Sequence, residues 1–137
     1  MKDGRVTVEV YSRAAEEEEF RHCVPGRLSL RNGFRTLVYR EPGEDGVCVR
    51  LTLLPAGVRL FRRGSTLDFE TSLLPGARTE SVYRAVGLAF PTVTETEICE
   101  VKEEEKVLSL RIRYKLTIGG AERIINFSLK AREGDIS

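Results

Sequence analysis

The sequence predicts an all-β protein that closes into one up-and-down antiparallel barrel of about eight to ten strands. Three observations predict it: apolar and polar residues alternate with a period of two, turn signals recur at short intervals, and one alternating segment is too long for a flat sheet. With 137 residues the chain suits a single domain, which we assign to 1–137.

The clearest alternation lies in 107–118. One parity is apolar and the other is polar: Leu108, Leu110, Ile112, Tyr114, Leu116 and Ile118 against Ser109, Arg111, Arg113, Lys115 and Thr117. Such a strand has one face in a core and one in water. At about 3.3 Å per residue it spans roughly 40 Å, and strands of this length coil until the sheet closes on itself.

Turn signals divide the rest of the chain. Asn32-Gly33 is the strongest, because both central positions of a type I′ hairpin turn need a positive φ. Asp45-Gly46, Pro55-Ala56-Gly57, Arg63-Gly64-Ser65, Pro75-Gly76 and Gly119-Gly120 act similarly. The predicted strands lie near 5–12, 19–31, 34–41, 47–54, 57–63, 65–73, 77–85, 92–102, 107–118 and 121–132.

Two segments need comment. Pro25-Gly26 is expected to split or bulge the second strand, since proline donates no hydrogen bond to a ladder. Residues 14–20 could form one helical turn at most, and their four adjacent glutamates indicate a solvated edge or loop. The strands otherwise follow in meander order, without a long crossover.

Charge and cysteine content narrow the function. The net charge is +1 with both signs interleaved, which argues against a dedicated nucleic-acid binder but leaves a local basic patch open. Cys23, Cys48 and Cys99 are odd in number and widely spaced, as expected of reduced thiols in a cytoplasmic protein. The first residues resemble no signal peptide, and no stretch approaches the roughly 18 apolar residues of a membrane span.

From 47 to 132 several features recur in an order typical of one known family. They are Arg62-Arg63-Gly64-Ser65 at a strand end, Phe69, Thr79 to Tyr83, Gly87, Thr94, Tyr114-Lys115-Leu116, Gly119-Gly120 and Asn126-Phe127. The chain resembles the YwiB-like family, bacterial calycin-type β-barrel proteins of unknown function. Arg84-Ala85-Val86-Gly87 departs from that pattern, where a Thr-Pro type connection is expected. The resemblance implies a closed, lipocalin-like barrel in the cytoplasm and carries over no activity.

Catalytic constellations are missing from the sequence. His22 is the single histidine, which argues against a His-dependent triad and against a multi-histidine metal site. We expect an ordinary, partly exposed strand histidine. Glu95 and Glu97 share a strand face as a glycosidase pair does, but a solvated outer face explains them better. We therefore predict a non-enzymatic protein without a metal or cofactor.

One interior region is predicted to hold a ligand. In the strands near 77–85 and 92–102, the inward parity carries small and hydroxyl side chains, whereas the inner face of 65–73 is apolar through Leu67, Phe69 and Leu73. The inward set is Ala77, Thr79, Ser81, Tyr83 and Ala85, followed by Thr94, Thr96 and Ile98. Arg62 shares the parity of Val58 and Leu60 and offers a fork to an anion near a barrel end.

The candidate ligand-binding residues are therefore Arg62, Thr79, Ser81, Tyr83, Thr94 and Thr96, for a small polar or anionic molecule. The open alternative is that the hydroxyls bond across strands or to trapped water while Arg62 reaches solvent.

Two further functions stay open. The outer rows Arg59, Arg111, Arg113 and Lys115 could pair with Glu95 and Glu97 across subunits of a homodimer or a protein complex, or could serve only solubility. RNA contact through the same arginines is disfavoured by the low net charge and by the scarcity of outward aromatic residues.

Overall fold

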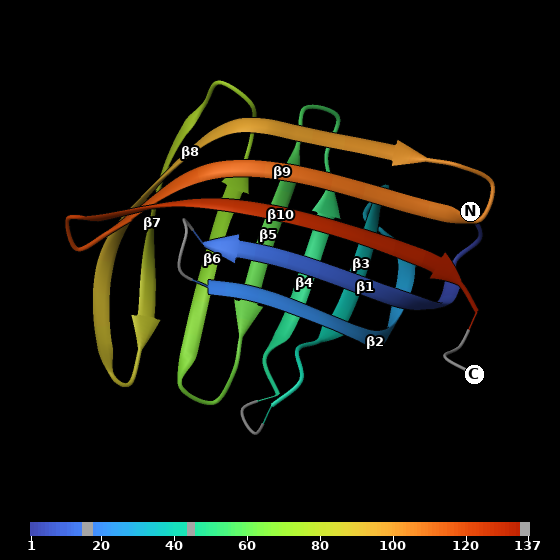
Figure 1. The fold of residues 1–137 in the computed structure, drawn as a ribbon, viewed down its shortest axis with the longest axis horizontal. Coiled ribbons are helices and arrows are strands. Elements are labelled where there is room, and N and C mark those ends of the chain that lie inside the picture. The colour runs from blue at the N-terminus through green and yellow to red at the C-terminus, as the bar shows by residue number, and fades with distance from the viewer. Residues whose placement is uncertain (15–17, 44–45, 135–137) are drawn as a thin grey trace.

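The structure is a computed structural model that describes residues 1–14, 18–43 and 46–134. The described residues form ten strands (Figure 1): β1 (Gly4–Ala14), β2 (Glu18–Arg31), β3 (Phe34–Arg40), β4 (Cys48–Leu53), β5 (Val58–Arg63), β6 (Leu67–Leu73), β7 (Arg78–Ala85), β8 (Leu88–Glu103), β9 (Val107–Ile118) and β10 (Ala121–Glu133). Each strand pairs antiparallel with its neighbours in the chain, and β1 pairs with β10, so the sheet closes. The predicted closed up-and-down barrel is confirmed.

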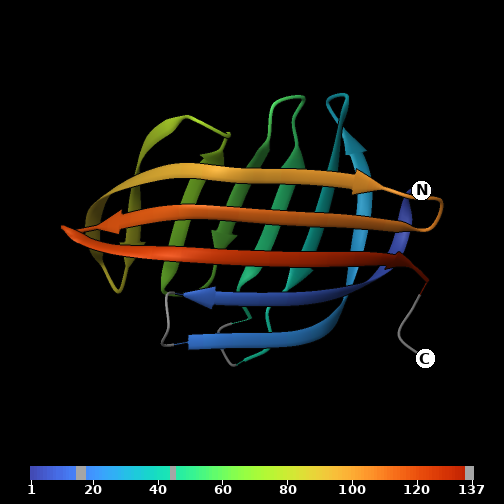
Figure 2. The ribbon, with the colours of Figure 1, turned by 45° about the horizontal axis from the view of Figure 1, so that its top comes forward.

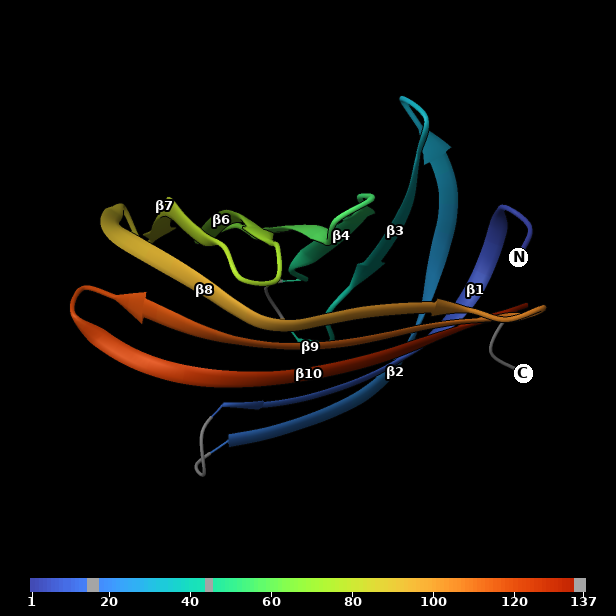
Figure 3. The same ribbon diagram turned by 90° about the horizontal axis from the view of Figure 1, so that it is seen from above.

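The barrel is flattened into two layers. Figure 2 shows the long strands β8, β9, β10 and β1 passing in front of the shorter β3 to β7 at a steep angle. Figure 3 shows β2 running from one layer into the other. Long strands supply this geometry because a coiled strand can contribute to both layers.

The predicted split or bulge at Pro25-Gly26 is wrong: β2 runs unbroken from Glu18 to Arg31 and keeps its register with β1 through both residues. β2 pairs with β1 as far as Leu28, but it pairs with β3 only from Gly26 onward. A Cβ at residue 26 would lie 2.7 Å from Val8 Cγ2 and 3.0 Å from the Val38 carbonyl oxygen. Only glycine lets three strands approach so closely here.

Two strand limits differ from the sequence prediction. β8 begins at Leu88 rather than near 92, because Val86 and Gly87 both have positive φ values, of 51° and 76°, and make a tight turn. A β-branched residue with positive φ is rare, so the sequence carries no signal for this hairpin. Ala14 lies in β1 and Phe20 in β2, while residues 15–17 of the expected helical turn lie outside the described residues.

The interior is an aliphatic core built from the alternating parity of every strand. Its largest fully buried side chains include Leu28, Leu37, Leu51, Leu73, Leu108, Ile112 and Leu129. Burying one such side chain contributes about 1.5–3 kcal/mol relative to leaving it in water. No described segment forms a helix that is long and apolar enough to cross a membrane.

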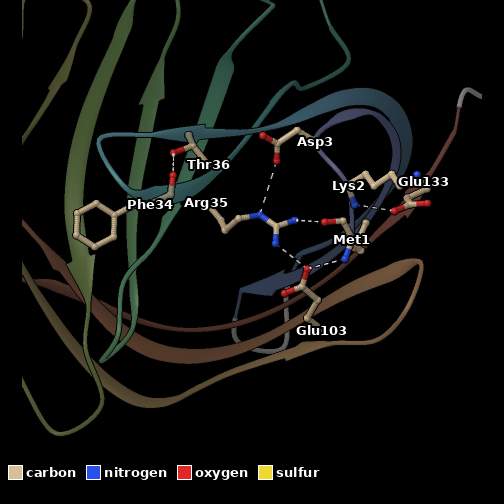
Figure 4. Close-up of polar contacts among 8 residues, drawn as sticks. All are labelled: Met1, Lys2, Asp3, Phe34, Arg35, Thr36, Glu103 and Glu133. Carbon is tan, nitrogen blue, oxygen red and sulfur yellow. Dashed lines mark hydrogen bonds and ion pairs between the residues drawn. The ribbon is translucent and has the colours of Figure 1, made fainter.

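One end of the barrel is closed by the chain's own polar groups (Figure 4). Arg35, at the start of β3, donates to Glu103 Oε1 at 2.8 Å and to the Met1 carbonyl oxygen at 3.1 Å. The Met1 ammonium reaches the same Glu103 oxygen at 3.0 Å, and the Met1 side chain packs against the core. These contacts tie β3, β8 and the segment before β1 together across the barrel end.

Candidate ligand site at one end of the barrel

The hydroxyl side chains predicted to line the interior do face inward, but three of the four bond to other groups of the protein. Thr71 donates to Thr94 at 2.9 Å in the core, and Ser81 and Thr92 lie 2.7 Å apart through their hydroxyl oxygens. Thr79 donates to the Ser72 carbonyl oxygen at 3.2 Å. The cross-strand alternative therefore holds for Thr79, Ser81 and Thr94, and their hydrogen-bonding capacity is largely used within the protein.

These hydroxyl contacts link β6, β7 and β8 where the backbone ladder is short. β6 and β7 share only three paired positions, from Leu67–Ala85 to Phe69–Tyr83. The buried Thr71 also corrects one expectation, since the inner face of 65–73 is not wholly apolar. Side-chain hydrogen bonds here hold strands together where main-chain bonds are few.

A β-bulge corrects the predicted parity of 92–102. The register of β8 against β9 shifts between Thr96 and Ile98. Ile98 therefore lies opposite the exposed Arg113, while Cys99 lies opposite the buried Ile112 and packs against the core. The prediction that Ile98 points inward is wrong, because the extra residue of a bulge moves every later side chain to the other face. Burial raises the pKa of the Cys99 thiol.

At the bulge and just before it, the exposed carboxylates of β8 pair with cations of the same chain. Glu97 lies 3.0 Å from the Arg113 Nε atom, and Glu95 lies 3.7 Å from the Lys115 Nζ atom. These residues form the solvated outer face that the sequence predicts. Of the charged rows, Arg113 and Lys115 therefore have carboxylate partners within the chain, and Arg59 lies 3.9 Å from Glu70.

Arg62 lies elsewhere, in the wall of a cavity of about 310 Å³ at the barrel end opposite Arg35. Much of its apolar lining comes from Val10, Phe20, Val49, Leu60, Ile125 and Phe127. Its polar groups come from Ser12, His22, Tyr39, Glu41, Arg62 and Tyr114. Of the six predicted ligand-binding residues, only Arg62 lines this cavity. Thr96 instead has a buried hydroxyl without a hydrogen-bond partner among the described residues.

The strand register explains why these polar groups meet. Arg62 on β5 lies opposite Val49 on β4, and Val49 lies opposite Tyr39 on β3. Across the interior, His22 on β2 lies opposite Val10 on β1. Glu41 directly follows β3, and its backbone N–H donates to the Val47 carbonyl oxygen at 2.8 Å. Strands far apart in the sequence thus place their inward ends around one space.

Arg62 is the charged centre of this cluster. Its Nη2 atom donates to Glu41 Oε1 at 2.7 Å, and both side chains are about one-third exposed or less. Burial disfavours the charged guanidinium, but the hydrogen bond to Glu41 and the nearby Tyr83 and Tyr114 raise the pKa of Arg62 overall. Arg62 therefore keeps its charge. The ring centroid of Tyr83 lies 5.5 Å from that of Phe69.

The two phenols and the imidazole of the cavity are neutral at physiological pH. Burial raises the pKa of Tyr114 to about 12 and raises that of Tyr39 further, so both phenols stay protonated. Burial also lowers the pKa of His22, a shift that Glu41 partly opposes. The imidazole centroid lies 6.3 Å from that of Tyr39.

Two nitrogens in this cavity wall lack hydrogen-bond partners. His22 Nε2 and Arg62 Nε are both buried, and neither contacts a described acceptor or donor. An unmet buried polar group costs about 1–3 kcal/mol and is uncommon in folded proteins. His22 is a partly exposed strand histidine, as the sequence predicts, but its Nε2 atom is buried without a described partner. His22 shares the inward parity of Val24 and Leu28, which continues through Pro25-Gly26.

Within residues 1–14, 18–43 and 46–134, no cluster of three or more histidine, cysteine, aspartate or glutamate side chains is arranged to hold a metal ion. Cys23, Cys48 and Cys99 are all free thiols, Cys23 exposed and the other two half-buried.

Comparison with known proteins agrees with the resemblance noted in the sequence. The crystal structure of the ywiB protein from Bacillus subtilis superposes with a TM-score of 0.84, at 18% sequence identity over 97% of this chain and 94% of that one. At this identity the likeness establishes the fold. None of the curated proteins compared with the chain matches it. The model of a family described as a domain of unknown function (DUF1934) matches residues 6–130. The chain therefore belongs to the DUF1934 family and shares the barrel fold of the Bacillus subtilis ywiB protein.

Proposed function

We propose that this protein binds, without chemical conversion, a small molecule with an apolar body and one acidic group in the cavity around Arg62. The observation that carries the proposal is the pair of buried nitrogens without partners, His22 Nε2 and Arg62 Nε, in the wall of one cavity. A ligand acceptor group close to them would offset a desolvation cost that the protein alone leaves unmet.

The size and lining of the cavity restrict the ligand. A volume of about 310 Å³ lies at the lower limit of the 300–1,000 Å³ range typical of ligand pockets. Side chains such as Leu60, Ile125 and Phe127 suit an aliphatic or aromatic body. The protonated phenols of Tyr39 and Tyr114 can donate hydrogen bonds. A carboxylate on a small apolar skeleton meets these conditions.

The charge balance makes Glu41 a competitor of this ligand. Arg62 already donates one charge-assisted hydrogen bond to Glu41, so an incoming carboxylate must share or replace that partner. Binding of a monoanion would leave one cation facing two carboxylates unless Glu41 turns away. Glu41 therefore sets the affinity of the site.

Binding rather than catalysis is favoured by the groups present. Among the described residues, no hydroxyl or thiol is hydrogen-bonded to His22, so the site lacks an activated nucleophile. The three free thiols fit the reducing cytoplasm, where we place this activity.

The first test is native mass spectrometry of gently purified protein beside its denatured mass. A reproducible adduct that is lost on denaturation supports the proposal, and Arg62→Met should remove it. Ser81→Ala is the matched control, because Ser81 faces inward but lies outside the cavity lining. An adduct retained by Arg62→Met would contradict the proposed site.

A second test compares two probes of nearly equal shape, benzoate and benzamide, by NMR titration. We expect benzoate to shift the signals of His22 and its neighbours at lower concentration than benzamide. In Glu41→Gln, benzoate affinity should rise by roughly tenfold, equivalent to about 1.4 kcal/mol. Equal affinities of the two probes in both proteins would refute an anion-selective site.

A further inference from the structure

Four arginines on the outer face of β2 to β5 form one row. Arg27 lies opposite Val38, and Val38 lies opposite Arg50. Arg40 stands two residues beyond Val38, and Cys48 lies opposite both Arg40 and Arg63. Each member, in the order Arg27, Arg40, Arg50, Arg63, is thus the diagonal neighbour of the next. Diagonal neighbours in a sheet are about 7–8 Å apart. We call these four residues the arginine row.

All four side chains point away from the core. Their chain neighbours on the inner face include Leu28, Tyr39 and Val49, which are buried. Arg27, Arg40 and Arg63 are exposed, and Arg50 is half-buried because it lies over a ring. The row therefore crosses four strands on the outside of the barrel, on the opposite side of the sheet from the proposed ligand cavity.

Little negative charge balances this row. Among the described residues, no carboxylate lies within ion-pair distance of Arg27, Arg40 or Arg50, and Asp68 meets only Arg63, at 3.4 Å. Arg40 donates to the Gly46 carbonyl oxygen at 3.0 Å. By contrast, Arg113, Lys115 and Arg132 in β9 and β10 each have a carboxylate partner. Neighbouring like charges destabilise a sheet, so an anion that covers the row gains from all four.

The surface around the row suits bases as well as phosphates. The guanidinium carbons of Arg50 and Arg63 lie 4.4 and 4.9 Å from the centroid of the outward-facing Phe61 ring, which keeps both groups near one aromatic side chain. A groove of about 550 Å³ runs beside Arg27 and Arg40 over Val24 and Val38. Guanidinium planes and apolar floors both accept stacked bases.

We propose that the arginine row binds the phosphate backbone of single-stranded nucleic acid. A zigzag of cations across four strands matches a linear, flexible polyanion better than a compact anion. The convex barrel wall presents no helix or ribbon that enters a duplex groove, whereas a single strand can follow its curvature. The net charge of +1 argued against this partner, but it combines a charge of +4 over residues 18–63, which contain the row, with −3 over the rest of the chain.

The test is fluorescence anisotropy of a short, fluorescein-labelled single-stranded RNA of mixed sequence, titrated with the full chain over a range of salt concentrations. Four phosphate contacts predict a slope of log affinity against log salt of about −2.8, since each contributes about −0.7 on single strands. The double variant Arg27→Ser/Arg50→Ser should halve that slope to about −1.4 and weaken binding at every salt concentration.

The matched control is Arg111→Ser/Arg123→Ser, which removes the same charge from β9 and β10 and should leave the slope unchanged. Thermal melts verify that both variants fold. Equal loss in the two variants would reduce the effect to net charge and overturn the proposal. So would the absence of binding at low salt, tighter binding of the duplex form of the same RNA, or binding of phosphatidylserine vesicles without binding of RNA.

Discussion

Both ends of the barrel contain one inward-facing arginine paired with a glutamate, and they differ in what else the arginine meets. Arg35 contacts Glu103 and the Met1 carbonyl oxygen, with Asp3 Oδ1 at 4.0 Å from its Nε atom. Arg62 has one side-chain partner among the described residues, Glu41. The first arginine is surrounded by chain, and the second borders a cavity of about 310 Å³.

An inward-facing charged side chain in this barrel therefore has no fixed role. At the Arg35 end, Glu103 of β8 and the Met1 carbonyl oxygen each accept a hydrogen bond, so the arginine ties these segments together, although its Nε atom is buried without a described partner, as in Arg62. At the Arg62 end, β3, β4 and β5 supply one carboxylate beside an apolar wall, so the arginine keeps donors for another molecule. Four experiments test this difference between the two barrel ends.

The largest effect should come from truncating aliphatic side chains at the two places. Leu37→Ala, at a fully buried site, should lower the free energy of unfolding by about 2–5 kcal/mol through lost contacts and a new void. Leu60→Ala should cost less, near the lower limit of that range, because Leu60 already borders the cavity. Urea denaturation measures both. Equal losses would mean that the cavity end is packed as tightly as the core.

Exchanging each arginine for methionine tests the contrast directly. Arg35→Met should lower the free energy of unfolding by about 1–3 kcal/mol, because it leaves partly buried acceptors without a donor. Arg62→Met should cost less, since Arg62 donates one hydrogen bond where Arg35 donates two. A larger loss for Arg62→Met in urea denaturation would show that Arg62 chiefly stabilises the fold.

Acid should weaken the closed end through Glu103. Its hydrogen bond from the Met1 ammonium, with Arg35 adding to it, lowers the pKa of this carboxyl below its usual value. Because the folded pKa is the lower one, the stabilisation is present above the unfolded glutamate pKa of about 4.3 and is lost as the pH falls through the folded value. The difference in urea midpoint between the wild type and Glu103→Gln should therefore shrink below about pH 4. A constant difference down to pH 3 would contradict this assignment.

The smallest effect concerns His22 at the cavity end. Burial lowers its pKa, so the unfolded chain takes up the proton first, and stability should fall slightly as the pH drops below about 6.5. As the single histidine of the chain, it can be titrated by NMR without assignment of other rings. Benzoate should raise the measured pKa if the anion lies beside the imidazole, and benzamide should not. A benzoate-independent pKa would place the anion elsewhere.

Much of the fold could be predicted because its signals are local. Asn32-Gly33 makes the expected turn with positive φ at both residues, and the alternation in 107–118 recurs as the burial pattern of β9. The Val86-Gly87 hairpin could not be predicted, since valine disfavours positive φ and only the pairing of β7 with β8 compensates it.

The candidate site was predicted only in part. The parity of β5 correctly turned Arg62 inward, but the parity of β8 failed at Ile98, where a bulge leaves no mark in the sequence. Tyr39 and Glu41 share the end of β3, but His22 comes from β2 and Arg62 from β5, so no pattern along the chain connects all four.

Most strands, most turns and the closure of the barrel could be predicted from the sequence alone, because side-chain alternation and turn geometry depend on residues next to each other in the chain. The tertiary structure was needed to show which inward polar groups hydrogen-bond to one another, which line one cavity, and which arginines lie together on one outer face. Those outcomes depend on the register between strands distant in sequence, and a shift of one residue moves a side chain to the other side of the sheet.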